Sequence, residues 1–120
     1  MNKKTLVLGA SLNEDRYSNI AIQRMVHSSL EVVAIGLVSG MVAGVSIKTG
    51  YPEIEDVHTI TIYLNPKRQV IYYNYIISLK PKRVIFNPGT ENTELMKLLR
   101  KNNIKVEVAC TLVLLSTDQY

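Results

Sequence analysis

Apolar and polar residues form blocks along the chain, and these blocks predict strands that alternate with helices. Short runs of aliphatic and β-branched residues, each bounded by charged or turn-forming residues, predict buried strands over 5–8, 31–38, 59–64, 83–86 and 105–108. The run over 31–38 is almost continuously apolar, which is typical of a strand covered on both faces. A further short strand is a candidate over 45–47.

Helical signals lie between these strands. Segment 19–29 carries apolar residues at helical spacing, and Ser18 is its predicted N-cap. Pro66 suits the first position of a second helix, which runs to about residue 79. A third helix begins at residue 92 or 93 and ends at 101, and the apolar segment 110–115 is either helical or extended.

This alternation predicts an α/β fold, with a mainly parallel sheet of about five strands and helices on both faces. Ligands bind such sheets at the carboxyl ends of the strands, near the point where the strand order reverses. Three loops with turn-forming residues leave predicted strand ends and are expected to converge there: Gly9-Ala10-Ser11, Asn65-Pro66 and Asn87-Pro88-Gly89.

The first loop follows the order of a phosphate site, in which a strand, a small-residue turn and a helix succeed one another. It lacks the Gly-x-Gly-x-x-Gly pattern, because residues 11 and 14 are Ser and Glu, and no acidic residue ends the second strand. A nicotinamide dinucleotide is therefore disfavoured. Arg16 precedes the predicted helix and could pair with a phosphate; the alternative is a solvated arginine that balances Glu14 and Asp15.

The loop Asn87-Pro88-Gly89-Thr90-Glu91-Asn92 is rich in hydrogen-bonding groups. It could bind a ligand, but Asn and Gly also form turns and cap helices, and from the residues alone this second interpretation is favoured.

Composition narrows the function classes. The 120 residues suit a single domain over 1–120, and the net charge of +4 suits a small polyanionic ligand. No basic stripe with interleaved aromatics favours nucleic acid, and no apolar run approaches the ~20 residues of a membrane span. The single cysteine excludes an internal disulfide and indicates a cytoplasmic protein, and metal-ligand spacing is absent.

We assign no catalytic residue from the sequence. Cys110 would need a nearby base, and neither His27 nor His58 is paired with it by the pattern, so a small buried thiol is the favoured interpretation.

The helix over 70–79 has no continuous polar face. We predict that it forms a homodimer contact with Tyr72, Tyr73 and Tyr75 as anchors. The alternative is that one tyrosine face packs on the sheet and the others lean outward.

Several of these stretches together resemble a known family. Gly9-Ala10-Ser11, Arg16-Tyr17-Ser18-Asn19, the loop over 87–92 and Cys110 resemble the small stand-alone CoA-binding domain proteins. These are similar to the CoA-binding domain of the succinyl-CoA synthetase α subunit, and the resemblance covers nearly the whole chain.

The resemblance implies a Rossmann-like three-layer α/β/α fold with CoA along the strand ends. It implies that Gly9, Ala10 and Ser11 lie against the phosphates and that Arg16 and Ser18 hold them. Tyr17 and Asn19 belong to the same stretch. By the same resemblance, Asn65 and Pro66 line the nucleotide, and Asn87, Pro88 and Gly89 line the pantetheine channel. Ser39 completes the expected set, in a loop where relatives often carry an Asn-Pro turn and a basic residue.

The function expected from this resemblance is non-catalytic binding of coenzyme A or an acyl-CoA. The catalytic histidine of the synthetase has no matching segment, so its chemistry is not implied. Two alternatives stay open: a small enzyme that acts on a nucleotide or acyl thioester through Cys110 or a tyrosine, and a regulatory protein whose site has decayed.

Overall fold

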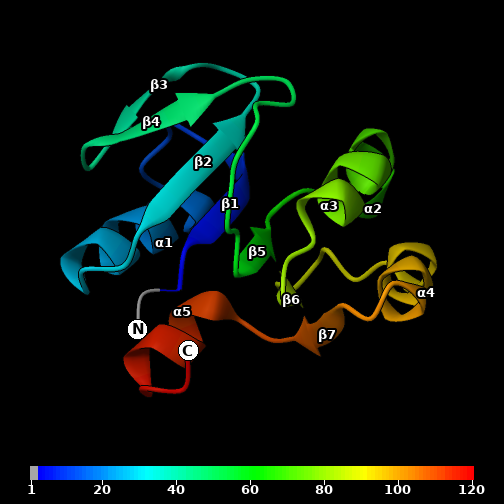
Figure 1. Ribbon diagram of the computed structural model, residues 1–120. Coiled ribbons are helices and arrows are strands. Elements are labelled where there is room, and N and C mark those ends of the chain that lie inside the picture. Colours follow the sequence, from blue (N-terminus) through cyan, green and yellow to red (C-terminus); the bar gives the residue numbers. More distant parts are fainter. Residues whose placement is uncertain (1–2) are drawn as a thin grey trace.

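The computed structural model describes residues 3–120 and contains a seven-stranded sheet (Figure 1). The strand order is β3-β4-β2-β1-β5-β6-β7, in which β3 pairs with β4 antiparallel and the other pairs are parallel. The bounds are β1 Thr5–Ala10, β2 Val32–Gly36, β3 Gly40–Val42, β4 Val45–Lys48, β5 Thr59–Ile62, β6 Arg83–Phe86 and β7 Lys105–Val108. The predicted Rossmann-like α/β fold is confirmed, but the strand number of about five was too low.

The strand missing from the prediction is β3, which makes a tight hairpin with β4. Ala43 and Gly44 join the two strands, and both have a positive φ (49° and 82°), as the favoured two-residue hairpin turns require. Alanine is not a usual residue for such a turn, so the sequence carried a weak signal. The predicted strand over 31–38 ends earlier, at Gly36, because Leu37 and Val38 leave the sheet and are exposed.

Helices cover both faces of the sheet. α1 (Tyr17–His27) and α5 (Thr111–Ser116) contact each other on one face, where Ile22 and Met25 pack with Val7 and Ala34. The other face carries α2 (Pro66–Gln69), the 3-10 turn η1 (Val70–Tyr72), α3 (Tyr73–Leu79) and α4 (Thr93–Lys101). Figure 1 shows the two groups separated by the sheet. No helix within residues 3–120 is long and apolar enough to cross a membrane.

Two helix predictions need correction. The helix expected over 66–79 is interrupted by η1, so α2 and α3 are separate short helices. Ser18 is not an N-cap: Arg16 is the extended residue before α1, and its carbonyl accepts hydrogen bonds from the N–H groups of Asn19 and Ile20. Ser18 therefore lies inside the first turn, where it is buried.

The apolar segment α2–α3 is covered in part by the chain itself. The Tyr51 ring lies 5.5 Å from the Tyr72 and Tyr75 rings, measured between centroids. The Tyr51 hydroxyl donates to the Ile71 carbonyl oxygen (3.0 Å), and the Tyr75 hydroxyl donates to the Pro52 carbonyl oxygen (2.6 Å). The tyrosines predicted as subunit anchors thus have partners within the same chain.

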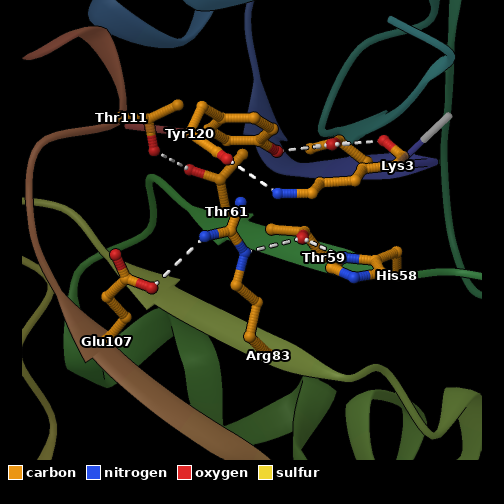
Figure 2. A network of polar contacts seen from close by, with 9 residues as sticks. Lys3, His58, Thr59, Thr61, Arg83, Glu107, Thr111 and Tyr120 are labelled. Carbon is orange, nitrogen blue, oxygen red and sulfur yellow. Dashed lines mark hydrogen bonds and ion pairs between the residues drawn. The ribbon is translucent and has the colours of Figure 1, made fainter. Parts of the chain in front are cut away.

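A polar network joins the amino ends of β1, β5 and β6 to the last residue (Figure 2). The Arg83 guanidinium lies 4.6 Å from the Tyr120 ring centroid, and it donates to the Thr59 hydroxyl (2.9 Å) and the Glu107 carboxylate (3.3 Å). Lys3 Nζ donates to the main-chain oxygen of Tyr120 (2.8 Å). Residues 3 and 120 are therefore neighbours, at the edge of the sheet opposite the strand carboxyl ends.

Candidate functional site

The strand order places a crevice between β1 and β5. From β1 the chain moves outward to β2 and β4, and it then returns to the other side of β1 to form β5, β6 and β7. The loops that follow β1 and β5 therefore diverge at their carboxyl ends. Open α/β sheets bind their ligands at this point of reversal.

A cavity of about 780 Å³ occupies this crevice. Its size lies in the range of small-molecule and cofactor sites. Its walls come from the loops after β1, β2 and β5 and from α1, α2 and the loop after β6. The lining residues are Gly9, Ala10, Ser11, Leu12, Asn13, Arg16, Tyr17, Ser18, Gly36, Leu37, Val38, Tyr63, Leu64, Lys67, Arg68, Ile71, Tyr72, Pro88 and Thr90.

Two glycines allow the close approach of strand ends that shapes the floor. Gly9 has a φ of +99°, and a Cβ at this position would lie 3.1 Å from atoms of Leu64 and Tyr63. At Gly36, a Cβ would lie 2.3 Å from the Ala10 carbonyl oxygen. A larger residue at Gly36 would therefore push β2 away from β1, and one at Gly9 would also strain the backbone.

The loop between β1 and α1 is held by its own polar groups. The Asn19 side chain donates to the Ser11 carbonyl oxygen (2.9 Å), and the Asn13 side chain accepts from the N–H of Asp15 (2.9 Å). The Arg16 side chain makes no capping hydrogen bond at α1. The first N–H groups of a helix have no acceptor within the helix, so the start of α1 at the cavity favours an anion.

The start of α2 brings two further cations to the cavity, Lys67 and Arg68. Asn65 caps this helix: its side-chain oxygen accepts from the N–H of Arg68 (3.0 Å), and Pro66 takes the first helical position. Neither Lys67 nor Arg68 was among the residues predicted from the sequence. The signal that could have found them is the pair of basic residues directly after an Asn-Pro helix start at a predicted strand end.

Most polar groups of the loop after β6 form hydrogen bonds with other groups of the protein. Asn87 is buried; its amide donates to the Thr61 hydroxyl (2.7 Å) and the Ile62 carbonyl oxygen (2.9 Å), and it accepts from the N–H of Thr111 (2.8 Å). The Gly89 N–H donates to the Glu91 carboxylate (2.8 Å). These contacts fit the turn-forming interpretation of the loop.

Asn92 and Gln69 connect this loop to the helices above it. Asn92 caps α4 through the N–H of Leu95 (3.2 Å) and donates to the Gln69 side-chain oxygen (2.9 Å). Gln69 in turn donates to the carbonyl oxygens of Leu64 and Thr90, both at 2.8 Å. These hydrogen bonds hold two lining residues, Leu64 and Thr90, at a fixed separation.

The structure brings some of the predicted site residues together and leaves others outside the cavity lining. Those that line it are Gly9, Ala10, Ser11, Arg16, Tyr17, Ser18 and Pro88. Those that do not are Asn19, Ser39, Asn65, Pro66, Asn87 and Gly89. Asn19, Asn65 and Asn87 instead hold the loops that carry lining residues, and Ser39 is exposed in the loop after β2.

The lining is positively charged. Arg16, Lys67 and Arg68 contribute cations, and within the described part of the chain no Asp, Glu, His or Cys lines the cavity. Burial raises the pKa of the Tyr63 phenol to about 12 and also raises the pKa of Tyr72. Both phenols are therefore neutral near pH 7, and the site retains its positive charge.

Cys110 and both histidines lie outside the lining. Cys110 is partly buried directly before α5, His27 ends α1, and His58 precedes β5. Over residues 3–120, no group of three or more His, Cys, Asp or Glu side chains could hold a metal ion.

The chain matches the family described as "CoA binding domain" over residues 3–116. A crystal structure of an uncharacterized protein is 48% identical, with a TM-score of 0.96, and the match covers 100% of this chain and 99% of that one.

Two more distant structures share the fold. A protein of Thermus thermophilus is 18% identical with a TM-score of 0.84, over 99% of this chain and 91% of that one. A hypothetical protein of Pyrococcus horikoshii OT3 is 22% identical with a TM-score of 0.83, over 93% and 80%. No curated protein matches the chain.

Proposed function

The chain belongs to the CoA binding domain family, and we therefore propose that it binds coenzyme A or an acyl-CoA in the cavity between β1 and β5. The observation that carries this proposal is the charge of the lining: three cations from two helix starts converge on one cavity that contains no acidic side chain among the described residues. Coenzyme A is a small molecule with several phosphate charges, which such a site complements.

The phosphates are proposed to lie between Arg16 on one side and Lys67 and Arg68 on the other, with the start of α1 facing them. Pro88 and Thr90 are proposed to line the path of the pantetheine arm. Three predicted residues lie outside the lining and are proposed to hold the loops that carry lining residues: Asn19, Asn65 and Asn87. A direct contact from Ser39 stays a prediction.

We propose that the binding is non-catalytic. General acid–base or nucleophilic catalysis requires a side chain such as His, Glu or Cys beside the substrate. The part of the chain that the structure describes places none of these at the cavity. We also propose that residues 1–120 form a single domain, as expected from the length of the chain. We propose a cytoplasmic location as well, as expected from the lone cysteine.

Calorimetric and thermal-shift titrations with CoA, dephospho-CoA, ADP and NAD test the proposal. We expect CoA to bind most tightly, dephospho-CoA more weakly because one phosphate is missing, and NAD not at all. At one hundred times its dissociation constant, CoA stabilises the fold by about 2.7 kcal/mol. That free energy corresponds to a rise in Tm on the order of 10 °C. No binding of any CoA species at millimolar concentration would contradict the proposal and favour a decayed site.

Charge variants test the location of the site. Arg16→Gln, Lys67→Gln and Arg68→Gln should each weaken CoA binding about tenfold or more, since each removes a charge-assisted contact. Lys97→Gln is the matched control, because Lys97 is exposed on α4 and lies outside the cavity lining. Equal effects of all four substitutions would mean that only the net charge matters and that the phosphates lie elsewhere.

A further inference from the structure

Residues 49–58, all within the described part of the chain, cross from β4 to β5 without forming a helix (Figure 1). The connections from β1 to β2, from β5 to β6 and from β6 to β7 each contain at least one helix. We call residues 51–57 of this crossover the strap. Ile54 and Val57 of the strap pack in the same core cluster as Tyr72 and Ile76. The strap therefore lies on the face of the sheet that carries α2, η1 and α3.

The Tyr51 side chain connects the strap to the wall of the cavity. Its hydroxyl donates to the Ile71 carbonyl oxygen (3.0 Å), and its ring centroid lies 5.5 Å from that of Tyr72. Ile71 and Tyr72 line the cavity, whereas Tyr51 does not. A second contact lies beside the first, because the Tyr75 hydroxyl donates to the Pro52 carbonyl oxygen (2.6 Å). The strap thus touches the wall of the cavity without forming part of it.

The wall at this point is built from short helical pieces. α2 has four residues and η1 has three, and isolated helices of this length are unstable in water. A 3-10 turn also has poorer hydrogen-bond geometry than an α-helix. The Gln69 side chain anchors this segment through two carbonyl oxygens, and Tyr51 anchors it at Ile71. Because α2 carries Lys67 and Arg68 and continues directly into η1, a shift of η1 would move these cations as well.

We propose that Tyr51 is a positioning residue of the CoA site, and that docking of the strap and binding of the ligand strengthen each other. This inference rests on the proposed function, which supplies the ligand. Ile71 is 66% exposed, so a ligand in the cavity would cover a side chain whose main chain Tyr51 holds. A wall that is already fixed loses less conformational entropy when the ligand binds. The coupling is reciprocal, so a bound ligand makes undocking of the strap less frequent.

Calorimetric titration of CoA into two variants tests the positioning role. Tyr51→Phe keeps the ring and removes the donor to Ile71, and it should weaken CoA binding by about twofold to tenfold, the range expected for one neutral hydrogen bond. Tyr51→Leu also removes the ring contacts and should weaken binding further. Tyr120→Phe is the matched control, because it removes a hydroxyl that pairs with Thr5 at the opposite edge of the sheet. It should leave the CoA affinity unchanged.

Limited proteolysis measures the reciprocal effect, which a purely structural role of Tyr51 would not produce. Glu53 and Glu55 are exposed in the strap, and a glutamate-specific protease can cut after them when the strap leaves its docked position. Saturating CoA should slow these two cuts in the parent, although neither residue lines the cavity. In Tyr51→Leu the cuts should be faster without ligand, and CoA should slow them much less.

The outcomes separate the inference from the proposed function. Tight binding of CoA to the parent, with equal affinity in both Tyr51 variants, overturns the inference alone. So does a loss of affinity in Tyr120→Phe as large as that in Tyr51→Phe, because affinity then follows overall stability. Equal slowing of the cuts by CoA in the parent and in Tyr51→Leu also overturns it. Failure of the parent to bind CoA overturns both.

Discussion

The Tyr63 side chain has an unusual position for a phenol. Its hydroxyl is buried and has no hydrogen-bond partner within residues 3–120, although Tyr63 directly follows β5 and borders the cavity. The nearby hydroxyls of Thr61 and Thr111 pair with each other at 2.8 Å. Burial raises the pKa of Tyr63 to about 12, and the neighbouring Thr61 and Thr111 hydroxyls oppose this rise only in part.

This pKa predicts how stability depends on alkaline pH. The native state keeps the Tyr63 proton up to about pH 12, while the unfolded chain releases it near pH 10. The stabilising contribution is thus complete below pH 10 and is lost as the pH rises toward 12. We expect Tyr63 to account for about 2–3 kcal/mol of lost stability in this window.

Urea unfolding of the parent and of Tyr63→Phe at pH 7, 10 and 11.5 measures this difference. The variant should be as stable as the parent or more stable at pH 7, because an unpaired buried hydroxyl is removed. It should then lose less stability than the parent at high pH. Parallel pH profiles of the two proteins would show that Tyr63 ionises normally in the native state.

Among the elements, those with the strongest burial were the most predictable. The centres of β1, β2 and β6 are apolar on both faces, and β5 alternates isoleucine with buried threonine; each of these strands lies within a run that the sequence marks clearly. The β3–β4 hairpin was harder because its turn, Ala43-Gly44, lacks the usual residues. The break at η1 was invisible because Val70, Ile71 and Tyr72 continue the apolar pattern, and the packing of Tyr51 on Tyr72 comes from a distant segment.

The candidate site was also predictable only in part. Glycine and proline at strand ends marked the loops, so Gly9 and Pro88 were predicted and do line the cavity. The sequence alone could not separate residues that face the cavity from those that support it. Asn65 and Asn87 belong to the second kind because their amides are used for capping and for buried hydrogen bonds.

The cap of α2 leads to a prediction about binding. Asn65→Ala removes the acceptor for the N–H of Arg68 and should lower the free energy of unfolding by about 1 kcal/mol. It should also weaken CoA binding, because α2 carries Lys67 and Arg68. Asn65→Ser keeps a capping oxygen and should restore both properties. Chemical unfolding measures the change in the free energy of unfolding, and calorimetry measures the change in CoA affinity. If Asn65→Ser also loses CoA affinity, Asn65 contacts the ligand directly.

At the scale of the whole molecule, the strand order decides where the site lies. The alternation of strands and helices predicted a parallel sheet, but it did not say that β5 returns to the far side of β1. That reversal depends on long-range pairing, such as Thr5 with Thr59 in β1 and β5, which local patterns do not reveal. The cavity could therefore be assigned to strand ends from the sequence, but not to a particular pair of strands.

The homodimer through residues 70–79 stays a prediction, and the structure narrows its basis. Tyr72 is buried, and the Tyr73 and Tyr75 hydroxyls have partners in the same chain, so the exposed apolar groups are Val70 and Ile71. A standard interface buries about 800 Å² per partner, which two side chains cannot supply. We expect a weak dimer that forms as concentration rises and that Val70→Asp abolishes. Sedimentation equilibrium that finds only monomer at high concentration would refute it.

The contact between Lys3 and Tyr120 brings residues that are 117 positions apart in the sequence next to each other (Figure 2). A short peptide could link residue 120 to residue 3 without crossing the cavity, which lies at the opposite edge of the sheet. New termini could then be cut between Ala43 and Gly44, in the exposed turn of the β3–β4 hairpin. We expect such a circular permutant to retain every strand and the lining of the cavity, so the proposed ligand binding should not depend on the order in which the strands are joined.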